Sequence, residues 1–176
     1  RATSMGLRQM SYLEALGEVA KPKRTVAVSG THGKTTTTAM LGRMLIEAGL
    51  DPTVVVGSIV TEWGSNFREG RSDLFVVEAC EYRNHFLTFK PDLLVITNVE
   101  LDHTDFFESV EQVKAAFEEA RAQASATIDS AEYSQLSVPE LLIPGEFNKE
   151  NARAAKAAAK RLAPEVPDEV WDRSLA

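Results

Sequence analysis

The chain has 176 residues, which predicts one domain, or one domain with a small additional part. Apolar residues make up 44% of the sequence and charged residues 26%, an ordinary globular composition that argues against wholesale disorder. The net charge of −7 argues against non-specific nucleic-acid binding, and no apolar run approaches the roughly 18 residues that span a membrane. We therefore expect a cytoplasmic protein that binds neither nucleic acid nor membrane. Because it begins at Arg1, we also expect it to be a piece of a longer chain.

Strands and helices alternate along the chain. Buried β-branched runs predict strands, and apolar residues at helical spacing predict helices. The predicted strands are residues 24–29, 53–57, 74–78 and 92–98. The predicted helices are residues 34–49, 109–124, 148–162 and 167–175. Gly49 should end the first helix, Ser109 and Gln112 fit a capping box, and Trp171 should pack inward. This order predicts an α/β fold with a mostly parallel sheet flanked by helices on both faces.

The connecting segments are less regular. Residues 57–72 are polar and contain Gly and Ser, which predicts a loop, and residues 79–90 predict a short helix or turn. Residues 125–145 predict mostly irregular structure. A parallel sheet should have another strand in that segment, and residues 140–143 (ELLI) are the only candidate.

The sharpest functional signal is a phosphate loop, because a buried strand runs into Gly30–Thr36 and a helix follows at once. Glycine lets the backbone approach phosphate oxygens, and the amides of a helix N-terminus attract an anion. Lys34 can neutralise the terminal phosphates, and the Thr35 hydroxyl can ligate Mg²⁺. The loop is shorter than the general P-loop pattern, which has a glycine where this chain has Val28. A plain Gly-rich turn is the alternative, but β-branched residues in a first helical turn disfavour it.

Further chemical groups follow the other predicted strands. Glu78 ends one strand, and His103 follows another, so both should lie with Lys34 at the carboxyl edge of the sheet, where ligand sites gather. Alone, a strand-end Glu is more often a solvated charge and a single His more often structural. Their convergence on a phosphate loop favours a site. Cys80, the only cysteine, excludes an internal disulfide, and we expect a small buried residue rather than a reactive thiol.

Four segments resemble the Mur ligase family, whose members add amino acids to UDP-N-acetylmuramic acid with ATP. The segments are GTHGKTT at 30–36, EACEYRNHFLTFKP at 78–91, TNVELDHTDFF at 97–107 and GEFNKENARAA at 145–155. His32 narrows the resemblance to the branch that adds L-alanine and to the related muropeptide-recycling branch. The resemblance implies a P-loop NTPase-like fold, in which residues 21–176 are the ATP-binding central domain of a three-domain enzyme. It also implies that residues 1–20 are a linker from a missing N-terminal domain, that the C-terminal domain is missing, and that residues 125–145 are shortened.

The resemblance also implies the roles of individual residues, with ATP and Mg²⁺ as the cofactors. The ATP contacts would be Gly30, Thr31, His32, Gly33, Lys34, Thr35, Thr36, Asn148 and Asn151. The catalytic residues would be Lys34 and His103, and the metal ligands Thr35, Glu78 and His103. The residues near the substrate would be Glu81, Tyr82, Asn98, Glu100 and Asp102. Phe147 stands where many relatives have a His beside the first Asn, which puts one adenine contact in question.

The implied reaction is carboxylate activation. ATP phosphorylates the lactyl carboxylate of UDP-N-acetylmuramic acid, the amine of L-alanine attacks the acyl phosphate, and phosphate leaves. A recycling ligase that takes a tripeptide is the alternative within the family. A P-loop switch that hydrolyses nucleotide is the alternative outside it, although the chain lacks a full P-loop pattern, a clear arginine finger and a basic track. The isolated chain is expected to bind ATP weakly and to be inactive in ligation.

Overall fold

A computed structural model describes residues 3–176 and contains a six-stranded sheet with the strand order β3-β2-β4-β1-β5-β6. All neighbouring pairs are parallel except β2 and β3, which are antiparallel. The strands are β1 (Arg24–Ser29), β2 (Thr53–Val60), β3 (Ser65–Arg68), β4 (Leu74–Glu78), β5 (Leu93–Ile96) and β6 (Thr127–Ile128). The predicted fold, a mostly parallel sheet flanked by helices, is confirmed.

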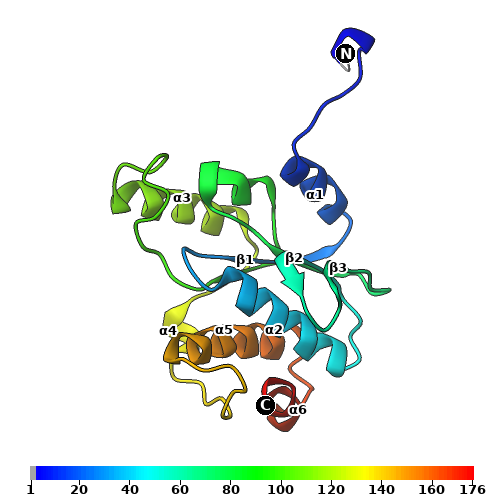
Figure 1. Ribbon diagram of the computed structural model, residues 1–176, viewed down its shortest axis with the longest axis vertical. Coiled ribbons are helices and arrows are strands. Elements are labelled where there is room, and N and C mark those ends of the chain that lie inside the picture. Colours follow the sequence, from blue (N-terminus) through cyan, green and yellow to red (C-terminus); the bar gives the residue numbers. More distant parts are fainter. Residues whose placement is uncertain (1–2) are drawn as a thin grey trace.

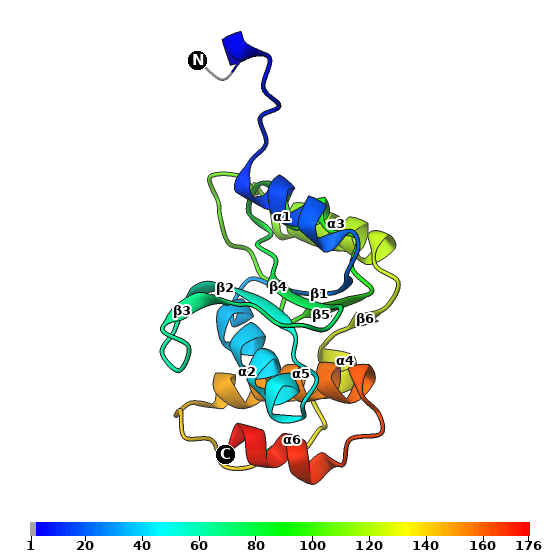
Figure 2. The same cartoon turned by 90° about the vertical axis from the view of Figure 1, so that its right-hand side faces the viewer.

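Helices cover both faces of the sheet (Figures 1 and 2). One face carries α1 (Tyr12–Ala20), η2 (Tyr82–Thr88) and α3 (Val110–Gln123). The other carries α2 (Lys34–Glu47), α4 (Ser130–Tyr133) and α5 (Glu146–Leu162), and α6 (Asp168–Leu175) packs against α2 and α5 on their side away from the sheet. A single turn, η1 (Thr3–Met5), precedes them. Alternate residues of β1 enter two separate cores: Val26 and Val28 pack on the α2 and α5 side, and Ala27 packs on the α3 side. The sheet is therefore buried on both faces.

Most predicted boundaries hold within a few residues. Gly49 adopts φ 79° just after α2, as a helix-ending glycine should, and Trp171 is fully buried. β5 is shorter than the predicted strand, which leaves Asn98 in the following loop. The capping box of α3 is half formed. The Ser109 hydroxyl accepts from the Gln112 amide, but the Gln112 side chain accepts from the amide of Glu108 instead of returning to Ser109.

The prediction of a loop over residues 57–72 is wrong in part. β2 continues to Val60, turns through Gly64 at φ 62° and returns as β3. Gly57 lies inside β2, and the carboxylate of Glu78 approaches it so closely that a Cβ at this position would lie 2.6 Å from each carboxylate oxygen. A glycine that suggested a strand end therefore marks a close approach of the site to the strand.

The prediction that residues 140–143 supply the additional strand is also wrong. The sixth strand is β6, which pairs with β5 in parallel through Val95 and Ile128. Pro139 and Pro144 flank the ELLI segment, and Leu142 is 85% exposed. Most of residues 125–145 outside β6 and α4 is irregular, as predicted.

The linker predicted over residues 1–20 contains the helix α1, and its first two residues lie outside the described part of the chain. Ser11 and Glu14 form a complete capping box at the start of α1. Gly17 packs so closely on η2 that a Cβ there would lie 2.9 Å from the Thr88 carbonyl oxygen. The role of this segment as a linker between domains stays a prediction. Among the helices of residues 3–176, none combines the length and the apolar character needed to cross a membrane.

Candidate functional site

The loop between β1 and α2 requires glycine at two positions. Gly30 has φ 137° and Gly33 has φ 80°, a region that L side chains rarely adopt. A Cβ at Gly30 would clash with the Thr97 hydroxyl, and a Cβ at Gly33 would clash with the side-chain oxygen of Asn151. The glycines therefore let the loop fit between the segment after β5 and the start of α5.

Asn98 accepts hydrogen bonds from two backbone amides of this loop. The Thr31 amide donates to the Asn98 carbonyl at 3.1 Å, and the His32 amide donates to the Asn98 side-chain oxygen at 2.8 Å. Gly33, the N-cap residue of α2, has no side chain to cap the helix. The amides of the first turn of α2 consequently remain the ones that can bind an anion. The Thr97 hydroxyl fixes the loop from below by donating to the His32 carbonyl at 2.5 Å.

Lys34 lies in a buried ion pair. Its ammonium group is 2.9 Å from a carboxylate oxygen of Glu81, whose side chain is only 2% exposed. The same ammonium donates to the carbonyls of Gly30 and Thr31, at 2.5 and 3.0 Å. The Lys34 side chain is 12% exposed, so the pair is largely desolvated and both partners depend on each other. A phosphate would compete with Glu81 for this charge.

Thr35 and Glu78 bring two oxygen ligands together at the end of β4. The Thr35 hydroxyl donates to Glu78 Oε1 at 2.9 Å, and the Gly57 amide donates to Glu78 Oε2 at 2.5 Å. A hydroxyl beside a carboxylate is a set of hard oxygen donors, which suits Mg²⁺. Two of the residues predicted to hold magnesium, Thr35 and Glu78, therefore have the ligand chemistry that this ion prefers.

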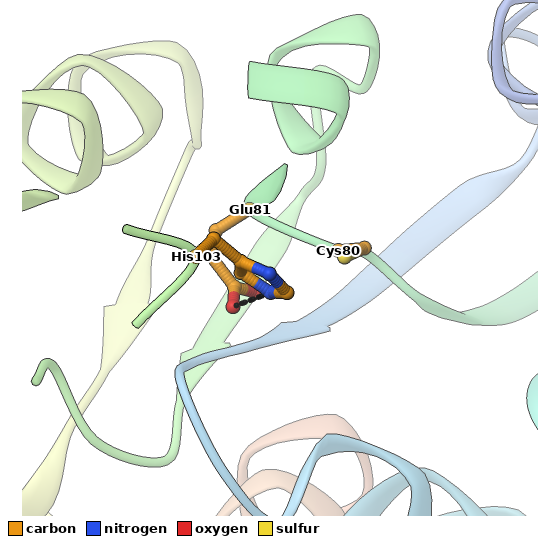
Figure 3. Close-up of side chains that lie close together, drawn as sticks. All are labelled: Cys80, Glu81 and His103. Atoms are coloured by element: carbon orange, nitrogen blue, oxygen red, sulfur yellow. Dashed lines mark ion pairs between the residues drawn. The ribbon is translucent and has the colours of Figure 1, made fainter. Parts of the chain in front are cut away.

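His103 contacts Glu81 rather than Glu78. Its Nε2 lies 3.4 Å from Glu81 Oε1 (Figure 3), and its backbone has φ 52°. The Asp102 carboxylate accepts from the His103 amide at 2.7 Å, and this hydrogen bond lowers the pKa of the Asp102 carboxyl. The Tyr82 ring lies 4.7 Å from the His103 ring, and its hydroxyl donates to Asp105 at 2.7 Å. His103, Glu81 and Tyr82 thus form one group beside Lys34, and the predicted metal role of His103 stays a prediction.

A cavity of about 720 Å³ opens beside the loop. It is lined by His32, Gly33, Thr36, Thr97, Asn98, Val99, Glu100, Ser130, Tyr133, Phe147, Glu150 and Asn151. Asn148 lies behind this lining. It donates to the Pro144 carbonyl at 2.7 Å and accepts from the Asn151 amide group at 3.3 Å. Asn151 therefore faces the cavity, while Asn148 holds Asn151 and the loop before α5 in place.

Several cavity residues escape prediction from the sequence. Thr97 lies in a predicted strand, and Ser130 and Tyr133 lie in a segment predicted to be irregular. The Tyr133 hydroxyl donates to the Thr97 carbonyl, which joins α4 to the end of β5. Burial raises the pKa of Tyr133 to about 12, because the ionised form would be desolvated. Thr97 immediately precedes the predicted residue Asn98, and this neighbouring position is the one feature of the sequence that could have indicated Thr97 as a site residue.

Comparison with known proteins places the chain in a family. The Mur ligase middle domain matches residues 28–126. The UDP-N-acetylmuramate–L-alanine ligase of Desulfitobacterium hafniense (strain Y51) is 50% identical over 119 residues, which are 68% of this chain and 26% of that protein. The same enzyme from Borrelia garinii subsp. bavariensis (strain PBi) is 45% identical over 117 residues, 66% of this chain and 25% of that protein. The chain thus spans about a quarter of the length of these relatives.

A solved structure has the same arrangement of elements. The UDP-N-acetylmuramate–alanine ligase of Thermotoga maritima superposes with a TM-score of 0.78 and 25% identity, over 93% of this chain and 46% of that one. The fold of this chain is therefore similar to that of a known ligase over nearly the whole of its length. With more than half of its residues matched by the middle-domain pattern, the chain belongs to the Mur ligase family.

Proposed function

We propose that this chain is the ATP-binding part of a ligase that joins L-alanine to UDP-N-acetylmuramic acid in peptidoglycan precursor synthesis. The observation that carries the proposal is the loop from Gly30 to Thr36, which sets Lys34 against Glu81 and Thr35 against Glu78 at the carboxyl edge of the sheet. The names of the relatives at 45–50% identity support the choice of substrates. The activity, the two substrates, the two further domains and a cytoplasmic location are all parts of the proposal.

The loop would bind the triphosphate of ATP. The amides of the first turn of α2 would contact the phosphates, and the macrodipole of α2 would add to the attraction. Lys34 would leave Glu81 and neutralise the terminal phosphate oxygens. Thr35 and Glu78 would hold Mg²⁺, which neutralises charge on the phosphates when bound. The role of these residues is therefore to position the nucleotide and to balance its charge.

The cavity of about 720 Å³ would receive the rest of the nucleotide. Asn151 lines it and Asn148 supports Asn151, so the proposed adenine contact falls chiefly to Asn151. Phe147 offers an aromatic ring at the same mouth and is 70% exposed. Asn98 and Glu100 face the same space, whereas Tyr82 and Asp102 line the neighbouring His103 group.

Glu81, His103 and Tyr82 would face the acyl phosphate end of the reaction. When Lys34 leaves Glu81, the Glu81 carboxylate stays beside His103 Nε2. The carboxylate can then orient the His103 ring. His103 would then act at the acyl phosphate, as the family resemblance implies. The acceptor amine approaches from a part of the enzyme that lies beyond this chain.

A calorimetric titration tests the nucleotide part of the proposal. ATP with Mg²⁺ should bind the isolated chain weakly, and Lys34→Ala should lower the affinity at least tenfold, about 1.4 kcal/mol. Lys21→Ala is the matched control, because it removes one positive charge from an exposed pair with Glu18. Equal affinities in the wild type and Lys34→Ala would contradict the assignment of the phosphate loop.

A ligation assay on the whole enzyme tests the substrate part. Mass detection should show UDP-muramyl-alanine when L-alanine is supplied, and no product from this chain alone, because we propose that another domain holds the uridine end of the substrate. Preference for a tripeptide over L-alanine would favour the recycling ligase. ATP hydrolysis stimulated by a macromolecule and not by either substrate would favour the nucleotide switch.

A further inference from the structure

The peptide between His32 and Gly33 lies just before α2 and carries two groups of opposite polarity. Its carbonyl accepts from the Thr97 hydroxyl at 2.5 Å and from the Asn98 side-chain amide at 3.4 Å. Its N–H, the Gly33 amide, has no hydrogen-bond partner within residues 3–176, and Gly33 lines the cavity. We propose that Thr97 is a positioning residue whose hydroxyl directs the Gly33 amide at the phosphates of the nucleotide. This inference rests on the proposed function.

The geometry of a trans peptide links the two groups. The carbonyl and the N–H of a planar trans peptide point in opposite directions, and residues 3–176 contain no cis peptide bond. Thr97 directly follows β5, and its amide donates to the carbonyl of Ser29 at the end of β1. A carbonyl that is bound to Thr97 is therefore turned toward the sheet. The Gly33 N–H is consequently turned away from the sheet.

Thr97 is itself held firmly. Its carbonyl accepts from the Tyr133 hydroxyl, and the residue is 8% exposed. A hydroxyl has one proton, and the His32 carbonyl at 2.5 Å is a nearer acceptor than the Ser29 carbonyl at 3.2 Å. Gly30 leaves the space that this hydroxyl needs, since a Cβ there would lie 2.0 Å from it. The direction of the His32 carbonyl is thus set before any nucleotide binds.

Without this hydroxyl, the peptide is free to turn over. Gly33 has φ 80°, and glycine adopts positive and negative φ about equally readily. The preceding peptide is held separately, because the His32 amide donates to the Asn98 side chain at 2.8 Å. After a flip, the His32 carbonyl oxygen would face the phosphates and repel them. Thr97 therefore determines whether this peptide presents a donor or an acceptor to the nucleotide.

Three variants test the effect on the peptide without nucleotide. Thr97→Val has nearly the same shape but no hydroxyl, whereas Thr97→Ser keeps the hydroxyl. Thr25→Val is the matched control, because Thr25 is 2% exposed and donates to the Ala20 carbonyl at the opposite end of β1. Crystal structures should show the peptide between His32 and Gly33 turned over in Thr97→Val alone. The original orientation in Thr97→Val would overturn the proposal.

Calorimetry with ATP and Mg²⁺ tests the consequence for binding. Thr97→Val should lower the affinity about tenfold, because a phosphate loses one backbone donor and meets a carbonyl instead. Thr97→Ser and Thr25→Val should both stay close to the wild type, although Thr25→Val also loses a buried hydrogen bond. Equal affinity in the wild type and Thr97→Val would overturn the positioning role. Absence of ATP binding in the wild type would instead contradict the proposed function, and the nucleotide-free structures would still decide the effect of Thr97 on the peptide.

Discussion

The two walls of the main cavity differ in how firmly they are held. The loop wall, Gly30–Thr36 with Thr97 and Asn98, is tied by hydrogen bonds between side chains and backbone and contains a buried ion pair. The helix wall, from α4 to the start of α5, carries Phe147 at its mouth, and the segment before it exposes Leu142. The phosphate end of the proposed site is therefore prebuilt, whereas its base end is open. Changes in the loop wall should alter stability and binding together, and changes at the open mouth should alter binding alone.

Lys34→Ala should have the largest effect. It leaves Glu81 as a buried charge without its partner, so the free energy of unfolding should fall by about 3 kcal/mol. Denaturant titration measures this loss. The double variant Lys34→Ala with Glu81→Ala should recover much of it, because the unpaired charge is gone. A double variant no more stable than the single one would show that the ion pair does not hold the loop wall.

Gly33→Ala should come next. An alanine at φ 80° costs about 1–2 kcal/mol in strain, and its methyl group would displace the side chain of Asn151. Gly49→Ala is the matched control, because φ is 79° there and nothing lies within 4 Å of the added Cβ. Thermal unfolding should therefore show a larger loss at Gly33, and calorimetry should show weaker ATP binding only there. Equal losses in both variants would mean that the contact with Asn151 has no consequence.

Glu78→Ala should weaken ATP binding about tenfold in Mg²⁺, or about 1.4 kcal/mol, and hardly at all in EDTA. The reason is that Glu78 is proposed to act through the metal, and without Mg²⁺ its charge repels the nucleotide. Paired titrations in the two buffers measure the difference. The same loss in both would remove Glu78 from the metal ligands.

Tyr133→Phe should lower stability by about 1 kcal/mol near neutral pH, since the Thr97 carbonyl loses its donor. Burial raises the pKa of Tyr133 from 10.0 to about 12, so the unfolded chain ionises first and the folded state loses stability as pH rises through that window. The variant should show a shallower decline between pH 10 and 12 in denaturant titrations. An equally steep decline would show that Tyr133 stays protonated in both states or ionises in both.

Phe147→Ala should have the smallest effect and the most selective one. At 70% exposure the ring contributes less than about 0.5 kcal/mol to folding, so unfolding should hardly change. Loss of stacking on the base should lower ATP affinity about fivefold, or about 1 kcal/mol. Leu142→Ala, at a residue that does not line the cavity, should change neither quantity. A large loss of stability in Phe147→Ala would abolish the distinction between the two walls.

The sequence indicated the contiguous loop Gly30–Thr36 together with Asn98 and Asn151, but it missed Thr97, Ser130 and Tyr133, for a physical reason. A phosphate loop is formed by residues that are contiguous in the chain. The strand is followed directly by the glycines, Lys34 and the helix, so the pattern can be found from their spacing in the sequence. Glu78 and His103 could be added because parallel strands end at one edge. Thr97, Ser130 and Tyr133 carry no such local pattern, and they become cavity residues only through packing.

By itself, the sequence determined the alternation of strands and helices, the glycine-containing loop between β1 and α2, and the family, because each depends on periodicity or on contiguous motifs. Only the tertiary structure decided which polar side chains pair. Lys34 selects Glu81 and Thr35 selects Glu78, although the two carboxylates are three residues apart in one segment. It also decided that Gly57 stays within a strand and that the Thr97 hydroxyl reaches the His32 carbonyl. These outcomes depend on side chains from different strands meeting at a desolvated edge, where burial and close approach, rather than sequence spacing, determine the partners.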